Sequence, residues 1–93
     1  MLIWSSKDPD EVLDYTHDWT DRLDGDTITG TPTATVIQGD VVKNSTSTTN
    51  GVQTVWLSAG TDGTHCLIEL ECTTTGGRTF QEVVQIWVRE RGW

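Results

Sequence analysis

The stretch THCLIELECTTTGGRTFQEVVQIWVRE, residues 64–90, decides the fold. In both halves of this stretch, apolar side chains recur at every second position, which is the period of a strand with one buried face. Gly76 and Gly77 separate the two halves and suit a tight turn. The stretch therefore predicts a long antiparallel hairpin whose buried face is formed by Cys66, Ile68, Leu70, Cys72, Val84, Ile86 and Val88.

Three further segments surround this hairpin. In TITGTPTATV, residues 27–36, threonine occupies every odd position, which predicts a strand with one face in water. Pro32 cannot donate to a strand ladder, so this strand is expected at a sheet edge or with a bulge. GVQTVWLSAG, residues 51–60, predicts another strand, with either Val55 or Trp56 facing the core. NSTSTTNG, residues 44–51, has no apolar residue, and we expect a loop there.

The segment 12–20 is open to two interpretations. Its apolar residues fit helical spacing as well as strand spacing, but its aromatic and threonine content favours a strand. That strand places Tyr15, His17 and Trp19 on one face and Asp14 and Asp18 on the other. Residues 21–26 then form a turn or a short 3₁₀ segment. With seven strand-sized segments and no long helical pattern, we expect residues 1–93 to form a single small β-sandwich domain.

The charge excludes one class of function. The formal net charge is −8, so a basic patch that binds nucleic acid is not expected. Residues 1–26 hold eight acidic side chains and two basic ones, whereas the tail VRERGW is locally basic. The apolar run at the N-terminus is too short for a signal peptide, and no stretch could span a membrane. We therefore expect a protein made in the cytoplasm, without membrane contact.

The two cysteines are expected to be free, buried thiols. Cys66 and Cys72 lie six residues apart on one predicted strand, roughly 20 Å and thus beyond disulfide reach. A zinc half-site is the alternative, but the chain offers no second cysteine pair, and His65 faces the opposite side of the strand.

No arrangement of catalytic residues is recognisable. Asp14 and Asp18 are roughly 13 Å apart on one strand, whereas paired catalytic carboxylates converge to ~5–10 Å. His17 and His65 belong to no known catalytic or metal motif. The segment Asp24-Gly25-Asp26 could hold a cation, but it lacks the rest of a calcium loop. We expect no enzyme activity and no cofactor.

Five tryptophans remain to be placed. Trp19 and Trp56 lie within strand patterns and are expected in the core, whereas Trp87 shares the polar parity of its strand and is expected to be exposed. Trp4 and Trp93 lie near the ends of the sequence, where a thin core has little to cover them. Tryptophan and arginine are enriched at interface anchors.

These features predict a docking surface at the acidic N-terminal third. Its apolar tip reaches onto a neighbouring subunit, while the carboxylates set the register of the contact. The alternatives are that the ends of the chain fold back over the sandwich and that the acids only keep the domain soluble. The candidate partner-contact residues are Leu2, Ile3, Trp4, Asp8, Asp10, Asp14, Trp87, Arg91 and Trp93.

Three runs carry a resemblance to a known family. They are KDPDEVLDYTHDWTDRLDGDTI, VWLSAGTDGTHCLIELECTTTGGRT and VQIWVRERG, which together cover most of the chain. They resemble a family of small tailed-phage proteins known as fibre–tail adaptors. The matched positions are Asp8, Pro9, Asp10, Asp18, Trp19, Gly25, Asp26, Ile28, Leu57, Gly60, Thr61, Gly63, Arg78 and Glu90.

The resemblance implies an immunoglobulin-like β-sandwich and a structural role in the virion, with no catalytic residues. A member would join the head–tail connector or adaptor ring, or the tail nozzle, to the tail fibres, in several copies per particle. A capsid-decoration protein or a carbohydrate-binding β-sandwich module is the alternative. A sugar-binding site, however, requires two or three coplanar aromatic rings with amide side chains nearby, and the sequence shows neither feature beside Trp87.

Overall fold

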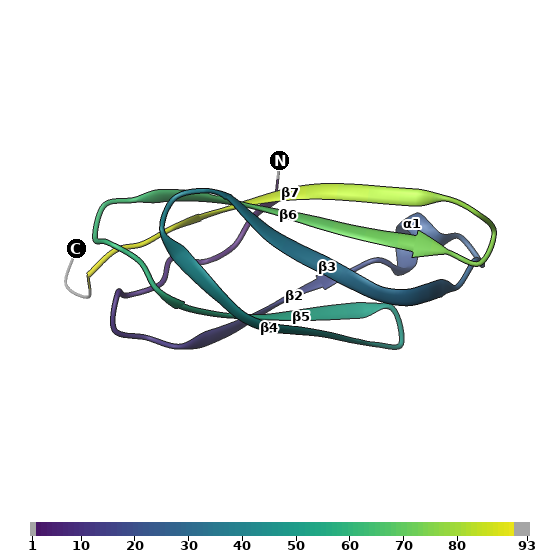
Figure 1. Ribbon diagram of the computed structural model, residues 1–93, viewed down its shortest axis with the longest axis horizontal. Helices are drawn as coiled ribbons and strands as arrows, with labels where there is room; N and C mark the ends of the chain where they lie inside the picture. Colours follow the sequence, from purple (N-terminus) through teal and green to yellow (C-terminus); the bar gives the residue numbers. More distant parts are fainter. Residues whose placement is uncertain (1, 91–93) are drawn as a thin grey trace.

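The computed structural model describes residues 2–90. Within them the chain forms seven strands and one short helix (Figure 1). The elements are β1 (Leu2–Ile3), β2 (Leu13–Asp18), α1 (Thr20–Leu23), β3 (Ile28–Gln38), β4 (Val41–Thr49), β5 (Val52–Ala59), β6 (His65–Thr74) and β7 (Thr79–Trp87).

The strands form two sheets packed face to face. The order is β1-β7-β6-β3 in the four-stranded sheet and β2-β5-β4 in the three-stranded sheet, so the predicted β-sandwich is confirmed. The six long strands have the arrangement of an immunoglobulin-like domain, in which the second, fifth and fourth strands face the third, sixth and seventh. The molecule is elongated, with extents of 45 × 20 × 18 Å (Figure 1).

The hairpin that decides the fold is present as predicted. β6 and β7 pair antiparallel from His65 opposite Trp87 to Thr73 opposite Thr79. Most of their inward side chains are fully buried, among them Ile68, Leu70 and Ile86, whereas Phe80 and Glu82 near the turn are half-buried. Cys66 and Cys72 are buried and free, which confirms the prediction, and burial raises the pKa of the Cys72 thiol. The hairpin therefore supplies about half of the core.

Most of the other half comes from the three-stranded sheet. Tyr15 and Trp19 project inward from the β2 segment, and Val55 and Leu57 project inward from β5. The Trp19 indole nitrogen donates to the buried amide oxygen of Gln53 at 3.0 Å. Because a buried N–H without an acceptor is costly, Gln53 lets Trp19 sit in the core.

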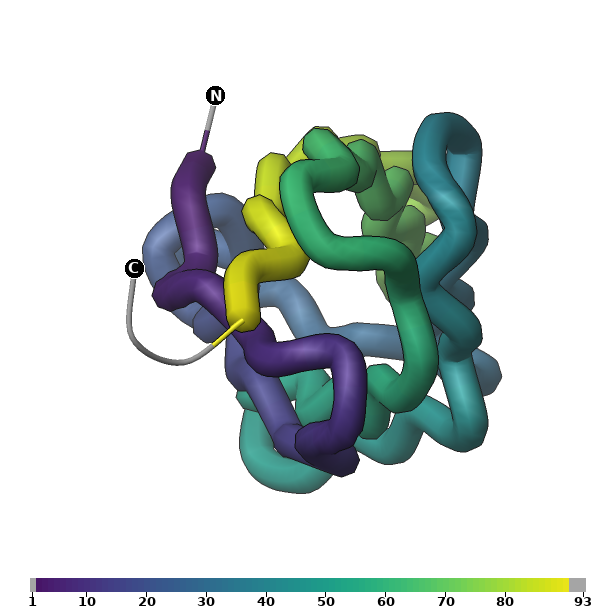
Figure 2. The backbone as a smooth tube through the Cα atoms, turned by 90° about the vertical axis from the view of Figure 1, so that its left-hand side faces the viewer, coloured from purple at the N-terminus to yellow at the C-terminus, as the bar shows by residue number. Residues whose placement is uncertain are grey.

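The acidic stretch after Asp18 turns the chain from one sheet to the other. β2 and α1 together confirm the predicted strand followed by a short turn-like segment, although the turn is α-helical over Thr20–Leu23. Both elements lie on the side of the sandwich where β1 also runs (Figure 2). No helix of the described part of the chain is long and apolar enough to cross a membrane.

β3 is an edge strand with irregular pairing, as Pro32 predicts. Its register with β6 shifts between Thr29 and Thr33 and again between Val36 and Gln38. Pro32 lies inside the first of these shifts, where its missing N–H removes nothing from the ladder. Both expectations for this strand, an edge and a bulge, are confirmed.

The expectation of a loop at residues 44–51 is wrong, because most of this range belongs to β4. β4 pairs with β5 along its length, and within this range its inward residues, Thr46 and Thr48, are polar and half-buried. The Thr46 hydroxyl donates to the Thr54 carbonyl at 2.9 Å and accepts from the Gln53 amide at 3.0 Å. Side-chain hydrogen bonds thus replace the apolar burial that would have marked the strand in the sequence.

The expectation that Trp56 lies in the core is also wrong. Val55 and Leu57 occupy the inward positions of β5 with no exposed surface, so strand alternation turns Trp56 outward, where its side chain is 41% exposed. Its ladder partners are Asp14 on β2 and Ser45 on β4.

Candidate interaction surfaces

The N-terminal strand β1 is held against the end of β7. The two strands pair parallel, with Leu2 opposite Val84 and Ile3 opposite Gln85. The contact continues beyond β1, since the Trp4 amide donates to the Gln85 carbonyl at 3.0 Å. The side chains of Leu2 and Ile3 are nevertheless 41% and 68% exposed. The structure therefore presents two apolar side chains on a fixed backbone.

Trp4 lies differently from its neighbours. It is half-buried, packs against the core and stacks on Tyr15 with ring centroids 5.0 Å apart. The interpretation that the apolar tip has no place in the core is therefore wrong for Trp4. The folded-back alternative describes Trp4 better. Leu2 and Ile3 are exposed, and their contact with a neighbouring subunit stays a prediction.

Lys7 fixes the segment that follows, although nothing in the sequence pattern marks it as buried. It has no exposed surface, and its Nζ donates to the carbonyls of Asp8 at 2.7 Å and Ala59 at 2.6 Å. Burial lowers the pKa of Lys7, against the opposing effect of Glu11, Asp8 and Asp10. The ammonium thereby ties the N-terminal segment to the end of β5.

Asp8 is buried along with Lys7, with 8% of its surface exposed. Its carboxylate accepts from the Asp10 amide at 2.8 Å, and its own amide donates to Glu11 at 2.9 Å. Asp8 therefore shapes the loop before β2 and does not lie on an exposed acidic face. Asp10, by contrast, is exposed.

Trp87 lies on the outer face of the four-stranded sheet. It is 36% exposed, as predicted, and His65 stacks on it with ring centroids 4.6 Å apart. The Arg89 guanidinium lies 5.5 Å from the centre of the same ring. Strand alternation puts Ile3 on this face too, because its partner Gln85 points outward. Arg91 and Trp93, also expected at an interface, lie outside the described residues.

Asp14 belongs to the opposite side of the molecule. It is exposed on β2 beside Trp56, on the outer face of the three-stranded sheet. The structure therefore does not bring the predicted contact residues into one surface. It divides them into an apolar surface, formed by Ile3 and Trp87, and an acidic surface, formed by Asp14 together with Asp10, which is exposed in the loop before β2. Leu2 lies on the other side of β1, because its partner Val84 points inward.

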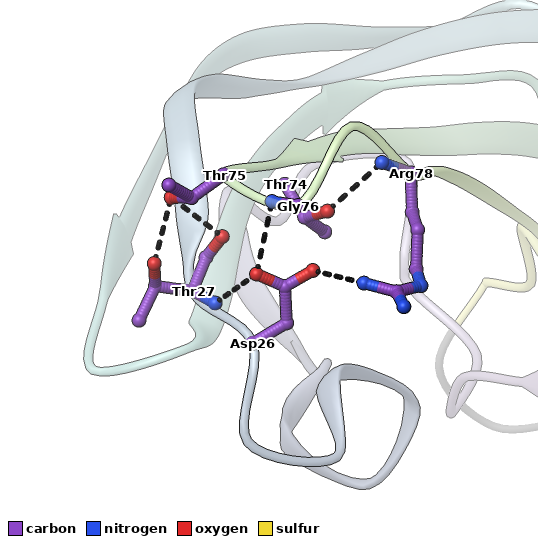
Figure 3. A network of polar contacts seen from close by, with 6 residues as sticks. All are labelled: Asp26, Thr27, Thr74, Thr75, Gly76 and Arg78. Atoms are coloured by element: carbon purple, nitrogen blue, oxygen red, sulfur yellow. Dashed lines mark hydrogen bonds and ion pairs between the residues drawn. The ribbon is translucent and has the colours of Figure 1, made fainter.

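Asp26 organises the end of the molecule that carries α1 and the β6–β7 turn (Figure 3). Its carboxylate accepts from the amides of Thr27 at 2.8 Å and Gly76 at 3.1 Å, and from Arg78 at 2.9 Å. Hydrogen bonds from Thr74, Thr27, Arg78 and Gly76 lower the pKa of Asp26 to about 2. This carboxylate is thus engaged by protein donors.

The two histidines lie in different parts of the fold. His17 faces the core beside Trp19, with burial lowering its pKa, whereas His65 lies on an outer face. Asp18 accepts hydrogen bonds from the hydroxyl and amide of Thr20, which lower its pKa. Within residues 2–90, no group of three or more His, Cys, Asp or Glu side chains is placed to hold a metal ion.

Comparison with known families identifies the chain. The family model described as podophage GP4 fiber-tail adaptor protein gp77 matches residues 7–87, from the buried lysine to the exposed tryptophan of β7. No curated protein matches the chain. This match confirms the resemblance drawn from the sequence, and the family is one of structural proteins. The chain therefore belongs to the podophage fiber-tail adaptor family, whose members are virion tail proteins that link the tail to its fibres and are not enzymes.

Proposed function

We propose that this adaptor uses its two surfaces for two partners, the apolar surface for the connector ring or nozzle of the tail and the acidic surface for the fibre. An adaptor needs two separate contacts, and Ile3 and Asp14 lie on opposite faces of the sandwich. Several copies would bind per particle, because a ring of identical subunits repeats the same site.

The observation that carries this proposal is the exposure of Ile3. Ile3 is 68% exposed, so a partner that covers it gains the free energy of burying an apolar side chain, and strand pairing with β7 holds it in place for that contact. Trp87 on the same face adds an aromatic anchor of the kind found at the centre of interfaces. The apolar surface therefore suits a permanent attachment within the virion.

The acidic surface is better suited to attracting a charged partner by long-range electrostatics than to forming a buried contact. Asp10 and Asp14 are exposed, and the chain around them carries most of the net charge of −8. Exposed charges raise association rates and are screened by salt over ~8 Å at physiological ionic strength. Binding through this surface should therefore slow as salt is added.

The test uses native mass spectrometry of the chain with the purified connector complex. Ile3→Ser should weaken the complex at least tenfold and lower the number of bound copies. Ile37→Ser is the matched control, since Ile37 is a 50% exposed isoleucine on β3, at the other edge of the same sheet. Equal binding by wild type and Ile3→Ser would overturn the assignment of the apolar surface.

The acidic surface is tested with the purified fibre protein. Neutralising Asp10 and Asp14 together to asparagine should lower the association rate and flatten its dependence on salt. Neutralising Glu69 and Glu71, on the outer face of the four-stranded sheet, is the matched control. If both double variants associate with the fibre at the wild-type rate, the acids serve solubility alone.

A further inference from the structure

The four sheet edges of this molecule are not equally protected. β1 has two residues, β2 carries Asp14 and Asp18, and β3 contains Pro32 within the first of its two register shifts. Short length, charge, proline and bulges are the devices by which proteins prevent unwanted strand pairing. Three of the four edges therefore discourage the addition of another strand.

The edge of β4 lacks these devices over residues 45–49. This segment, Ser-Thr-Ser-Thr-Thr, has no charge, proline or glycine, and its register with β5 is regular from Ser45 opposite Trp56 to Thr49 opposite Val52. Its only neighbour in the sheet order is β5, so within the described residues its other side has no strand partner. Within the described residues, five consecutive residues of β4 therefore have no strand paired on their outer side.

A hollow lies at the end of this edge. It measures about 430 Å³ and opens between the beginning of β3, the end of α1 and the β4–β5 turn. Leu23 and Ile28 give it apolar walls, and Thr48 and Asn50 connect it to β4. The Thr48 hydroxyl is buried without a hydrogen-bond partner in the described residues. A buried hydroxyl without a partner is costly, so an incoming donor or acceptor would be stabilised there.

We propose that residues 45–49 of β4 accept an extended, basic segment of a partner virion protein as an added strand. Main-chain hydrogen bonds along β4 would supply affinity, and alternate side chains would supply specificity. A side chain that faces inward opposite Thr48 enters the hollow beside Leu23 and Ile28. This inference rests on the adaptor role but not on which partner the Ile3 surface binds.

Charge favours a basic partner segment over a second copy of this chain. The chain carries a net charge of −8, and acidic residues of β2 and α1 flank this end of the sandwich, among them Asp18 and Asp21. Two such molecules repel each other, whereas a lysine- or arginine-bearing segment is attracted. The small side chain of Ser45 also leaves the exposed Trp56 ring within reach of a cation on the added strand.

The test mixes the full chain separately with the purified tail complex and with the purified fibre protein of the same phage. The double variant Ser45→Lys/Ser47→Lys places two cations on the β4 edge and should weaken binding to one of these probes at least tenfold. Thr33→Lys/Thr35→Lys is the matched control on the protected edge β3, and it should bind within twofold of wild type. Equal binding by the β4 variant, or an equal loss in the β3 variant, overturns the proposal.

Hydrogen exchange of the wild-type chain gives a second readout that needs no variant. Peptides covering residues 44–50 should exchange rapidly in the free chain and become protected in the complex. An absence of added protection there overturns the proposal even if the lysine variant fails to fold. Protection that arises in the chain alone as its concentration increases would identify a second copy as the occupant and overturn it too. Ile3→Ser tests the apolar surface separately. If Ile3→Ser loses binding while residues 44–50 of wild type still become protected in the complex, the two proposals are shown to concern different contacts.

Discussion

Trp4→Ala should destabilise the folded chain, independently of any partner. The substitution removes a half-buried indole from the core boundary and ends its stacking on Tyr15, where the ring centroids are 5.0 Å apart and the planes 13° from parallel. Complete burial makes a tryptophan-to-alanine change cost about 3–5 kcal/mol, and an aromatic pair contributes about 0.5–1.5 kcal/mol of its own. For a half-buried residue we expect a loss of about 2 kcal/mol in the free energy of unfolding.

In a domain of this size that loss corresponds to a decrease of roughly 10 °C in the melting temperature. Thermal and urea unfolding followed by circular dichroism measure it directly. Trp87→Ala is the control, because Trp87 lies on the outer face and its removal takes away only its contacts with His65 and Arg89, a loss of about 0.5–1.5 kcal/mol. If Trp4→Ala melts within about 2 °C of wild type, Trp4 is not part of the core and the stacking on Tyr15 contributes little.

Three further outcomes are expected. Gln53→Ala should lower the free energy of unfolding by about 2–3 kcal/mol, because it leaves the buried indole N–H of Trp19 without an acceptor. Urea unfolding measures this loss, and a loss below about 1 kcal/mol would contradict the prediction. Gly39→Ala should lower the melting temperature in the same assay, because Gly39 has φ +89° and an added Cβ would press on Cys66; an unchanged melting temperature would refute that clash. Asp26 has a folded pKa of about 2, below an unfolded value of about 3.9, so its stabilisation is complete above about pH 5 and is lost progressively as the pH falls towards 2. Asp26→Asn should flatten this part of the stability curve measured by urea unfolding between pH 5 and 2, and an unchanged slope would show that the Asp26 hydrogen bonds do not contribute.

The parts of the fold that the sequence predicts are those where burial separates the two faces of a strand. β6 and β7 have apolar inward faces, so their period is visible without any knowledge of the partner strand. β4 escapes the same reasoning because its inward Thr46 is held by Gln53, seven residues away on β5. When the inward side chains of a strand are polar and form hydrogen bonds to a neighbouring strand, the strand has the amino-acid composition of a loop.

Which of the candidate contact residues are exposed is predicted less completely, for a related reason. The alternation in residues 51–60 fits two orientations, and only the packing of Val55 and Leu57 against the opposite sheet turns Trp56 outward. The burial of Trp4 depends on Tyr15, and that of Lys7 on the Ala59 carbonyl, which are both distant contacts. Local pattern carries no information about such partners.

The parallel pairing of β1 with β7 has a mechanical consequence. The two strands come from opposite ends of the described chain and run in the same direction, with further main-chain bonds from Trp4 and Lys7 to β7. A pull between the two chain ends would therefore load these bonds together in shear, whereas an antiparallel pair joined at one end would open bond by bond. A fibre transmits the drag of a moving virion to its attachment point, and a sandwich fastened in this way resists extension best along its own strands.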